Sequence, residues 1–293
     1  MSRLHMFIGK GGVGKSTCSS IAAMSMVLEG QSLLLDSMDP AHNLHDIFET
    51  KLGAREKRLL PKLMIRESDM EKMSREYMRD IQKEFKGLYH YQQALNIDKY
   101  FNILKYAPGM EEYAALLVLQ RCFNDDRFDQ IIIDTPPTAL TLRMLALPSV
   151  NLHWIYQLIA MRKEIVDKKN GIARIRKENL STLEEDPVYS RLNTMKSRYE
   201  HLQHMLEDAA VTEFVLVMNE DELSFSESIM IKEQIKNFGL NIHKVIINKS
   251  KQEEVVWGDR VKEAFPQATV EWVTMYKSEI RGIEMLKECS QQI

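Results

Sequence analysis

The sequence predicts an α/β fold with a doubly wound, mostly parallel sheet and helical insertions. Three observations support this prediction. A glycine-rich loop stands between an apolar run and a helical segment, further apolar runs alternate with helical segments, and one of these runs ends in Asp134. Strands that alternate with helices form parallel sheets with right-handed crossovers. We therefore expect a single domain of this kind over residues 1–293.

The glycine-rich loop over residues 9–17 fits the pattern Gly-x-x-x-x-Gly-Lys-Ser. Residues 4–8 before it are typical of a buried strand, and residues 16–30 after it are rich in Ala, Met and Ile, as in a helix. The loop amides, the helix N-terminus and Lys15 favour binding of phosphates, and Ser16 is placed to ligate Mg²⁺. This predicts a P-loop NTPase. The expected nucleotide-binding residues are Gly11, Gly12, Val13, Gly14, Lys15, Ser16 and Thr17.

Further apolar runs predict the other strands of the sheet. Residues 32–36 precede a polar loop at 37–44, and residues 130–134 end in Asp134. Ligands of open parallel sheets bind at the carboxyl ends of the strands. Asp134 is therefore a candidate for acting on Mg²⁺ or its water shell. Three later strands are expected at 213–218, 243–248 and 269–273.

Two helical segments precede the strand that ends in Asp134. Over residues 70–88 the apolar positions recur every three or four residues, which predicts a helix with one apolar face. A mostly apolar helix is expected over 109–122, whereas residues 89–106 show no clean period. We expect residues 68–106 to form part of a helical subdomain.

The second part of this subdomain is expected at about 150–208, which contains no strand pattern. The pair Asn170-Gly171 predicts a break in the helical segment, and residues 184–187 predict a turn. Residues 192–206 carry apolar side chains at 3-4-3-4 spacing. We expect this stripe to pack against the host domain or a partner helix.

Composition excludes several classes of protein. With 39 basic and 42 acidic residues the net charge is −3, which gives no support for a nucleic-acid partner. No apolar run approaches the roughly 18–20 residues that a membrane span needs. A strand begins within a few residues of Met1 and leaves no room for a signal peptide. The three cysteines are far apart, as expected of a cytoplasmic protein.

Several motifs, in this order along the chain, resemble those of one known family. Lys10 adds a second lysine to the P-loop, which gives a deviant Walker A motif. The others are Asp-Pro-Ala-His-Asn-Leu at 39–44, Pro-Gly-Met-Glu-Glu at 108–112, Asp-Thr-Pro-Pro-Thr-Ala-Leu-Thr-Leu-Arg at 134–143, Leu-Ser at 223–224 with Glu227, and Glu-Ile-Arg-Gly at 279–282. The chain thereby resembles the arsenite-pump ATPase family, which includes the ATPases that target tail-anchored membrane proteins.

The resemblance implies a homodimer that binds ATP and Mg²⁺ and hydrolyses ATP. Lys10 would reach the nucleotide of the partner, and Asp39 would orient or activate the attacking water. Asn43 would help to position switch I, which is the motif at 39–44. Asp134 would sense the metal from switch II, the motif that it begins, and Asn248 would hydrogen-bond adenine. Positioning and charge neutralisation are what phosphoryl transfer to water needs.

The expected catalytic residues are thus Lys10, Lys15 and Asp39. Asp36 is a rival carboxylate, and we prefer Asp39 because Pro40 follows it in the switch pattern. Two departures stand out. Switch II has Pro136-Pro137 and Ala139-Leu140 where the family has Ala-Pro and Gly-His, which predicts a smaller or differently coupled motion. The chain also lacks a Cys-x-x-Cys pair, so no zinc site is expected at a dimer interface.

The resemblance further implies that ATP-driven closure is coupled to capture of a protein client with an apolar helix, with a membrane receptor as a further partner. The chain has 18 methionines, whose side chains adapt to varied apolar partners. Those in the helical segments are Met70, Met73, Met78, Met161, Met195 and Met205. Two alternatives stay open: a nucleotide-locked binding scaffold, and another deviant Walker A switch without transmembrane clients, such as a metal-centre maturation or partition-type ATPase.

Overall fold

The computed structural model describes residues 2–41, 43–88, 109–177, 179–251 and 254–292. Contacts divide the chain into two compact units, Met1–Leu145 with Asp208–Ile293 and Ala146–Glu207. The expectation of one domain with helical subdomain segments at 68–106 and 150–208 stays a prediction. Residues 89–106 of the first segment lie outside the described residues.

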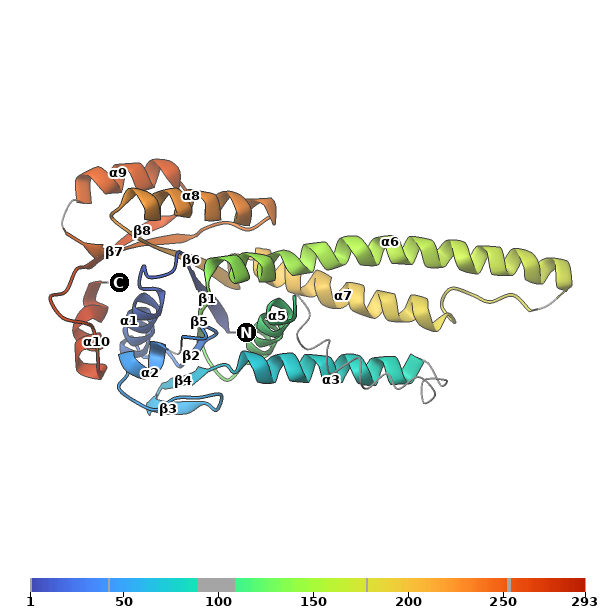
Figure 1. The fold of residues 1–293 in the computed structure, drawn as a ribbon, viewed down its shortest axis with the longest axis horizontal. Helices are drawn as coiled ribbons and strands as arrows, with labels where there is room; N and C mark the ends of the chain where they lie inside the picture. Colours follow the sequence, from blue (N-terminus) through green and yellow to red (C-terminus); the bar gives the residue numbers. More distant parts are fainter. Residues whose placement is uncertain (1, 42, 89–108, 178, 252–253, 293) are drawn as a thin grey trace. The chain divides into compact units, whose positions relative to one another are not determined.

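The first unit is built on a sheet with the strand order β3-β4-β2-β5-β1-β6-β7-β8 (Figure 1). All neighbouring strands pair in parallel, except that β3 pairs antiparallel with β4. The predicted α/β fold with a mostly parallel sheet is thus confirmed. The strands are β1 (Arg3–Ile8), β2 (Leu33–Ser37), β3 (Lys57–Leu60), β4 (Leu63–Glu67), β5 (Gln130–Asp134), β6 (Thr212–Asn219), β7 (Lys244–Ser250) and β8 (Thr269–Thr274).

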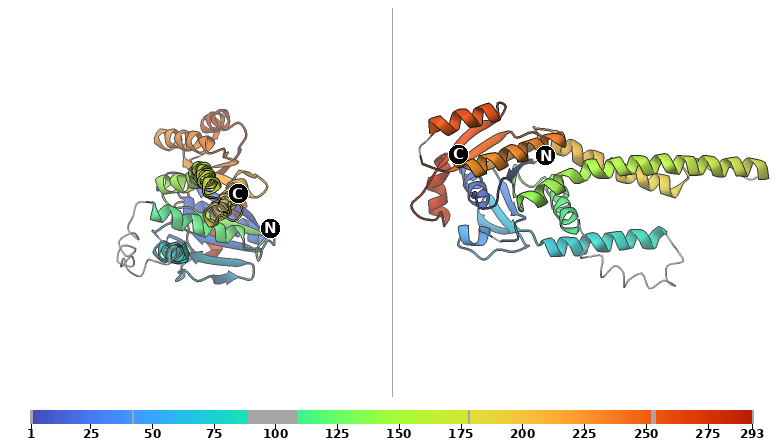
Figure 2. Two further views of the ribbon diagram at one scale, coloured as in Figure 1. Left: turned by 90° about the vertical axis from the view of Figure 1, so that its right-hand side faces the viewer. Right: turned by 45° about the horizontal axis from the view of Figure 1, so that its top comes forward.

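Helices line both faces of this sheet (Figure 2). From β1 to β2 the chain moves toward one sheet edge, and from β6 through β7 to β8 it moves toward the other. Right-handed crossovers therefore place α1 on one face and α8 and α9 on the opposite face. The helices are α1 (Lys15–Leu28), α2 (Asn43–Ile47), α3 (Met70–Leu88), α5 (Met110–Phe123), α6 (Thr138–Arg176), α7 (Pro187–Glu207), α8 (Glu222–Asn237), α9 (Glu254–Ala264) and α10 (Ile283–Cys289), with a 3₁₀ turn at Ser290–Gln292.

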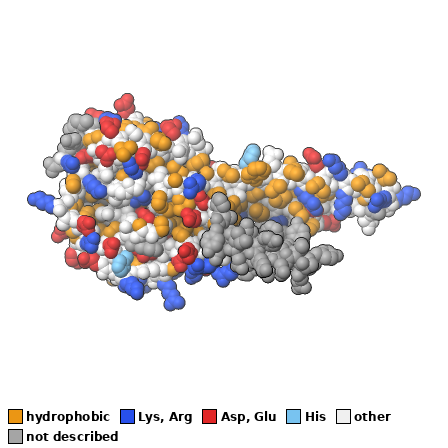
Figure 3. Space-filling view, viewed as in Figure 1, with side chains coloured by type: hydrophobic (Ala, Val, Ile, Leu, Met, Phe, Trp, Pro, Cys, Tyr) orange, Lys and Arg blue, Asp and Glu red, His pale blue; other side chains and the backbone are white. Residues whose placement is uncertain are grey.

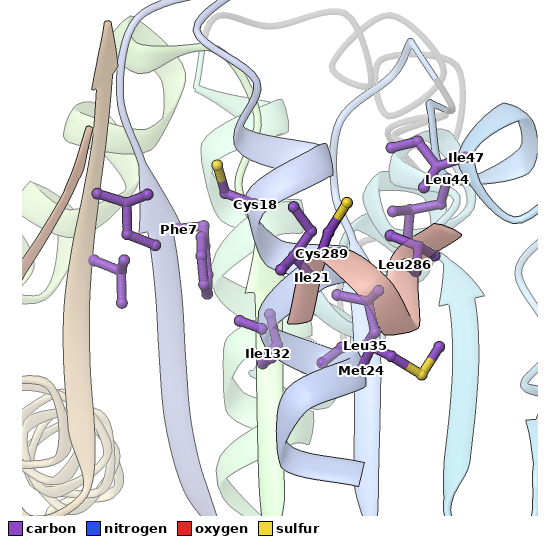
Figure 4. Packing of buried hydrophobic residues seen from close by; sticks show 14 of the residues in the cluster. Phe7, Cys18, Ile21, Met24, Leu35, Leu44, Ile47, Ile132, Leu286 and Cys289 are labelled. Atoms are coloured by element: carbon purple, nitrogen blue, oxygen red, sulfur yellow. The ribbon is translucent and has the colours of Figure 1, made fainter. Parts of the chain in front are cut away.

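The core on the α1 face holds the carboxyl ends of the strands in place. Phe7 from β1, Leu35 from β2 and Ile132 from β5 pack with Ile21 of α1 and Leu286 of α10 (Figure 4). All of these side chains are buried. Because protein interiors are close-packed, this cluster fixes the start of α1 relative to the strand ends. The well-packed ends of β1, β2 and β5 therefore hold the residues that follow them in place.

Two strands, β3 and β4, were not expected from the sequence. β4 alternates between buried and half-buried residues over only five positions, and β3 has four residues, two of them exposed. Such short runs carry little periodic signal, and their place at the sheet edge is set by the pairing of β4 with β2 and of β3 with β4. The remaining strands lie within a few residues of their predicted ranges.

The second unit contains most of α6 and all of α7. The predicted break at Asn170-Gly171 is wrong, since α6 runs through it to Arg176. The Asn170 side chain exchanges two hydrogen bonds with the backbone of Ser181, at 2.8 and 2.9 Å, which ties the following loop to the helix. One glycine costs a helix only about 1 kcal/mol, and its neighbours are good helix formers. The turn before Pro187 is confirmed.

Burial in α7 follows the predicted stripe except at one position. Leu192, Tyr199, Leu202 and Leu206 are buried, whereas Met195 is 36% exposed. In the part of the chain that the structure describes, none of the helices combines the length and the apolar character of a membrane span.

Candidate nucleotide-binding and active site

The P-loop connects β1 to α1 at the centre of the sheet. At two of its positions only glycine fits, because there is no room for a side chain. A Cβ atom on Gly9 would lie 2.3 Å from the Val217 carbonyl oxygen, and one on Gly14 would lie 2.2 Å from Nδ2 of Asn248. Gly12 and Gly14 also have positive φ angles of 83° and 95°. The loop can therefore form only with these glycines, and it leads directly into the N-terminus of α1, where backbone N–H groups attract anions.

Lys15 lies inside this loop. The residue is only 6% exposed, and Nζ donates to the Gly9 carbonyl oxygen at 3.2 Å and to that of Lys10 at 3.5 Å. Burial lowers the pKa of Lys15, while the negative charges of Asp134 and Asp39 oppose that effect. The site thus holds a partly desolvated cation among carbonyl groups. An anionic phosphate chain is the ligand that this arrangement favours.

A chain of hydrogen bonds joins the loop after β2 to the end of β5. The N–H of Asp39 donates to Oγ of Ser37 at 3.2 Å, and that hydroxyl donates to Oδ2 of Asp134 at 3.1 Å. Asp134 is fully buried, and its Oδ1 has no hydrogen-bond partner. Burial raises the pKa of Asp134 to about 6, against the lowering effects of the Ser16 hydroxyl and the Lys15 charge. The two predicted switch segments therefore meet beside Lys15.

Comparison of the sequence with known proteins places this chain in a family. The model of a family described as "Anion-transporting ATPase" matches residues 2–293. The chain belongs to this family. The resemblance inferred from the motifs is confirmed, and the protein is an ATPase.

This chain is similar to proteins that carry three kinds of name. It is 27% identical to a "Putative arsenical pump-driving ATPase 2" of Aquifex aeolicus, covering 99% of this chain and 98% of that protein. It is also 27% identical to "ATPase get3" of Schizosaccharomyces japonicus, with 96% and 89% of the two chains covered. "ATPase ASNA1 homolog 2" of Paramecium tetraurelia is 25% identical over 96% of this chain and 90% of its own length.

Asp36, the rival carboxylate of this ATPase, is held in an ion pair away from Lys15. The guanidinium of Arg66 donates to its Oδ2 from Nε at 2.8 Å and from Nη2 at 2.6 Å, and Ser68 Oγ donates to Oδ1 at 2.8 Å. Asp36 is fully buried, and burial raises its pKa while Arg66 opposes the shift. Both of its oxygens are thus used within the fold. Asp39 is half-buried, and its negative charge, together with that of Asp134, acts to raise the pKa of Lys15.

Lys10 and Thr138 connect the P-loop to two helices of the ATPase. Lys10 Nζ lies 3.2 Å from Oε1 of Glu227 on α8, and the two side chains are 29% and 37% exposed. The Thr138 hydroxyl, at the first residue of α6, donates to the Gly9 carbonyl oxygen at 2.9 Å. The P-loop is therefore in contact with the helix that follows switch II and with α8.

The other predicted site residues occupy the same sheet edge. Ser16 is buried in the first turn of α1, with Thr17 half-buried beside it, and Asn43 begins α2. Asn248 lies near the end of β7 as a buried side chain whose Nδ2 donates to the Val13 carbonyl oxygen at 2.7 Å. Its role toward adenine stays a prediction, since these bonds tie it to the P-loop.

Sequence reasoning missed Ser37 as a member of the site. It is the last residue of β2, and its hydroxyl is the only link between Asp39 and Asp134 among the hydrogen bonds described above. A hydroxyl at the carboxyl end of a strand beside the P-loop strand is a usable signal. The sequence-based prediction considered only the nearby aspartates, at 36 and 39.

The raised pKa of Asp134 gives a pH-dependent prediction. A carboxyl whose pKa rises from 3.8 to about 6 on folding contributes stability that is fully present below pH 3.8 and is lost as the pH rises to about 6. Asp134→Asn removes this charge at every pH. Without nucleotide and metal, the variant should exceed the wild type in free energy of unfolding by about 3 kcal/mol at pH 8, and by little at pH 4.

Urea denaturation of both proteins at pH 4, 6 and 8 measures this difference. Asp259→Asn, at an exposed position of α9, serves as the control and should change little at any of the three pH values. A stability difference for Asp134→Asn that is the same at pH 4 and pH 8 would contradict the assignment.

Proposed function

We propose that this ATPase is a homodimeric, Mg-ATP-hydrolysing switch, whose ATP-driven closure is coupled to the capture of a protein client with an apolar helix. The observation that carries the proposal is the juxtaposition of Lys15, Asp39 and Asp134 at one sheet edge, in a chain that also exposes a long apolar stripe on α6. The relatives named arsenical pump-driving, get3 and ASNA1 ATPases support the family setting of such a switch.

In this proposal the P-loop amides of residues 11–17 and Lys15 hold the phosphates. Asp39 lies near Lys15 and orients or activates the attacking water, with Asn43 positioning the same segment. Because Asp39 donates its N–H to Ser37, which in turn bonds Asp134, any change at Asp134 is transmitted to the residue beside the water. The chemistry is positioning and charge neutralisation, for which these groups suffice.

The residues of the site fit a magnesium ion. Asp134 has one buried oxygen without a hydrogen-bond partner, and the Ser16 hydroxyl lies close enough to lower the pKa of this carboxyl. Across the described ranges no three His, Cys, Asp or Glu side chains cluster tightly enough to hold a metal by themselves. Mg²⁺ commonly takes only one or two protein ligands together with water and substrate phosphates. Ser16 and Asp134 would hold it, and the ion would neutralise charge on the phosphates.

Lys10 supports the proposal of a dimer. Its ammonium is partly exposed and pairs within the chain with Glu227, so it can exchange this partner for a phosphate of a second copy. Lys10→Ala should weaken dimerisation in a non-hydrolysable ATP analogue about tenfold, because one charge pair across the interface is lost. Glu227→Gln frees Lys10 and should leave the dimer as strong or stronger. Sedimentation velocity measures both, and equal dimerisation of all three proteins would refute the role of Lys10.

The client surface is proposed on α6. Six side chains at spacings of three, four or seven residues are 44% to 85% exposed: Trp154, Leu158, Met161, Ile165, Ile172 and Ile175. We call this set the α6 stripe. Hydrophobic side chains lie along the helical unit in Figure 3. Spacing close to 3.5 residues over six turns is the pattern with which one helix packs along another.

Only some of the methionines that were expected to support client binding are exposed. Met73, Met78 and Met205 are buried and fill the core, while Met161 and Met195 are exposed. Only the exposed ones support client binding, and Met161 belongs to the α6 stripe. The buried ones act as ordinary packing residues.

The test uses a soluble protein fused to a single C-terminal apolar helix as the probe. Met161→Glu with Ile165→Glu should reduce ATP-dependent capture of the probe at least tenfold, because burying two such apolar side chains contributes about 1.5–3 kcal/mol each. His153→Glu with Ala160→Glu adds the same charge at two exposed positions of α6 outside the stripe and should capture the probe normally. Equal capture by both variants would remove the stripe from the proposal.

The remaining predictions on partners and location stay proposals. The three cysteines are free and buried, which suits a reducing compartment such as the cytoplasm. A membrane receptor would be a further partner of a client-carrying switch, and the net charge of −3 offers no support for nucleic acid.

A further inference from the structure

Lys249, next to Asn248 at the end of β7, has a backbone conformation that lysine seldom adopts. Its φ angle is +57°, in the left-handed region. The pairing of β7 with β8 shifts register between Asn248 and Ser250, so Lys249 stands at an irregularity of the strand. Such irregularities re-aim side chains next to active sites, and left-handed backbone in a residue other than glycine costs free energy. Something at this position therefore offsets that cost.

The side chain of Lys249 reaches the P-loop. Nζ donates to the Gly12 carbonyl oxygen at 3.2 Å, while Nδ2 of Asn248 donates to the Val13 carbonyl oxygen at 2.7 Å. The N–H of Lys249 donates to Oδ1 of Asn248 at 2.9 Å and so fixes the amide. Two successive side chains thus hold two successive P-loop carbonyl groups.

The loop after Lys249 is braced from the neighbouring strand. Both oxygens of the Glu220 carboxylate accept hydrogen bonds at 2.8 Å, one from the Ser250 hydroxyl and one from the N–H of Lys251. Glu220 directly follows β6. The irregular end of β7 is therefore tied to β6 on one side and to the P-loop on the other.

Holding these two carbonyl groups also orients N–H groups of the loop. In a trans peptide the C=O and the following N–H point in opposite directions, and the described peptides are all trans. Because the Gly12 and Val13 carbonyl groups point at Lys249 and Asn248, the N–H groups of Val13 and Gly14 point away from them. Those are N–H groups that the P-loop pattern directs at phosphates.

We propose that Lys249 is a positioning residue for nucleotide binding: with Asn248 it clamps the P-loop so that the N–H groups of Val13 and Gly14 are preorganised for the phosphates of a nucleoside triphosphate. The inference rests on the phosphate site proposed above. A preorganised donor loses no free energy to reorganisation when its ligand binds. Loss of the clamp should therefore speed nucleotide release more than it slows hydrolysis.

Three substitutions of the full-length protein test the clamp. Lys249→Met keeps the aliphatic stem without the ammonium, Lys249→Gly relieves the left-handed backbone, and Lys249→Arg keeps a cation. Stopped-flow release of a fluorescent ATP analogue gives the dissociation rate. We expect the Met and Gly variants to release nucleotide about tenfold faster and to bind it about tenfold more weakly, with kcat within about threefold of wild type, and the Arg variant to recover part of the affinity.

The melting temperature without nucleotide distinguishes a positioning role of Lys249 from a purely structural one. The Gly variant should melt at or above the wild-type temperature, because glycine tolerates positive φ. Unchanged release by the Met and Gly variants would overturn the inference, as would a loss of affinity that merely follows a lower melting temperature. Lys15→Ala is measured in parallel. If it still binds nucleotide, the proposed phosphate site is wrong. If it loses binding while the Lys249 variants release nucleotide like the wild type, only the clamp is refuted.

Discussion

Replacing Lys15 by methionine should lower kcat/KM for ATP hydrolysis about 1000-fold without weakening the fold. Lys15 is buried and its ammonium contacts P-loop carbonyl groups, where, in the proposed function, it would meet the phosphates in a site of low dielectric. Removing one preorganised donor to a developing negative charge costs about 100- to 1000-fold in rate, and here a full charge is lost as well. Phosphate release under steady-state conditions measures the effect.

The stability of the same variant is its control. Burial lowers the pKa of Lys15, so the folded protein holds this ammonium at a cost in free energy when no phosphate is present. Methionine keeps the volume of the side chain and removes the charge, and its melting temperature should equal or exceed that of the wild type. A variant that hydrolyses ATP near the wild-type rate would show that Lys15 does not contact the reacting phosphates.

Asp39→Asn should reduce kcat about 100-fold or more while ATP binds as tightly as to the wild type, or more tightly. Asparagine keeps the shape of the side chain, so its contacts to the loop, such as the bond from the Ala41 N–H to Oδ1 at 3.0 Å, can persist. What is lost is the negative charge that would orient or activate the attacking water. The same loss removes repulsion between Asp39 and the phosphates. Single-turnover hydrolysis and equilibrium binding separate the two effects.

Asp36→Asn is the matched comparison, since it changes the same kind of side chain three residues earlier. Its carboxylate is bound by Arg66 and Ser68, so the substitution leaves the largely buried guanidinium with Glu56 as its remaining carboxylate partner, at 3.1 Å. Burial raises the pKa of Asp36, so removing its charge offsets part of the stability lost when this buried pair is weakened. Hydrolysis by the folded protein should stay close to that of the wild type. The reverse outcome, with a slow Asp36 variant and a normal Asp39 variant, would exchange the two roles.

Local sequence patterns predicted the P-loop and most of the sheet well. The spacing of Gly9, Gly14 and Lys15 predicts a loop between a strand and a helix, and the positive φ angles at Gly12 and Gly14 agree with that prediction. The five-residue run that ends in Asp134 is recognisable because a doubly covered strand is apolar throughout. By contrast, β3 and β4 have only four and five residues, and β3 is half exposed, so neither gives a clear periodic signal. The predicted break in α6 is wrong because an Asn-Gly pair is typical of a turn only where the surrounding residues do not continue a helix.

The amino-acid sequence by itself determined the phosphate loop, the alternation of strands and helices and the family, because each depends on contiguous residues. Only the tertiary structure decided which side chains meet. Arg66 engages Asp36 and so separates it from Asp39, although both aspartates lie in one short segment. Ser37 meets Asp134 across 97 residues, and Lys249 meets Gly12 across 237. Such contacts follow from strand order and register across the sheet, and local periodicity carries no information about either.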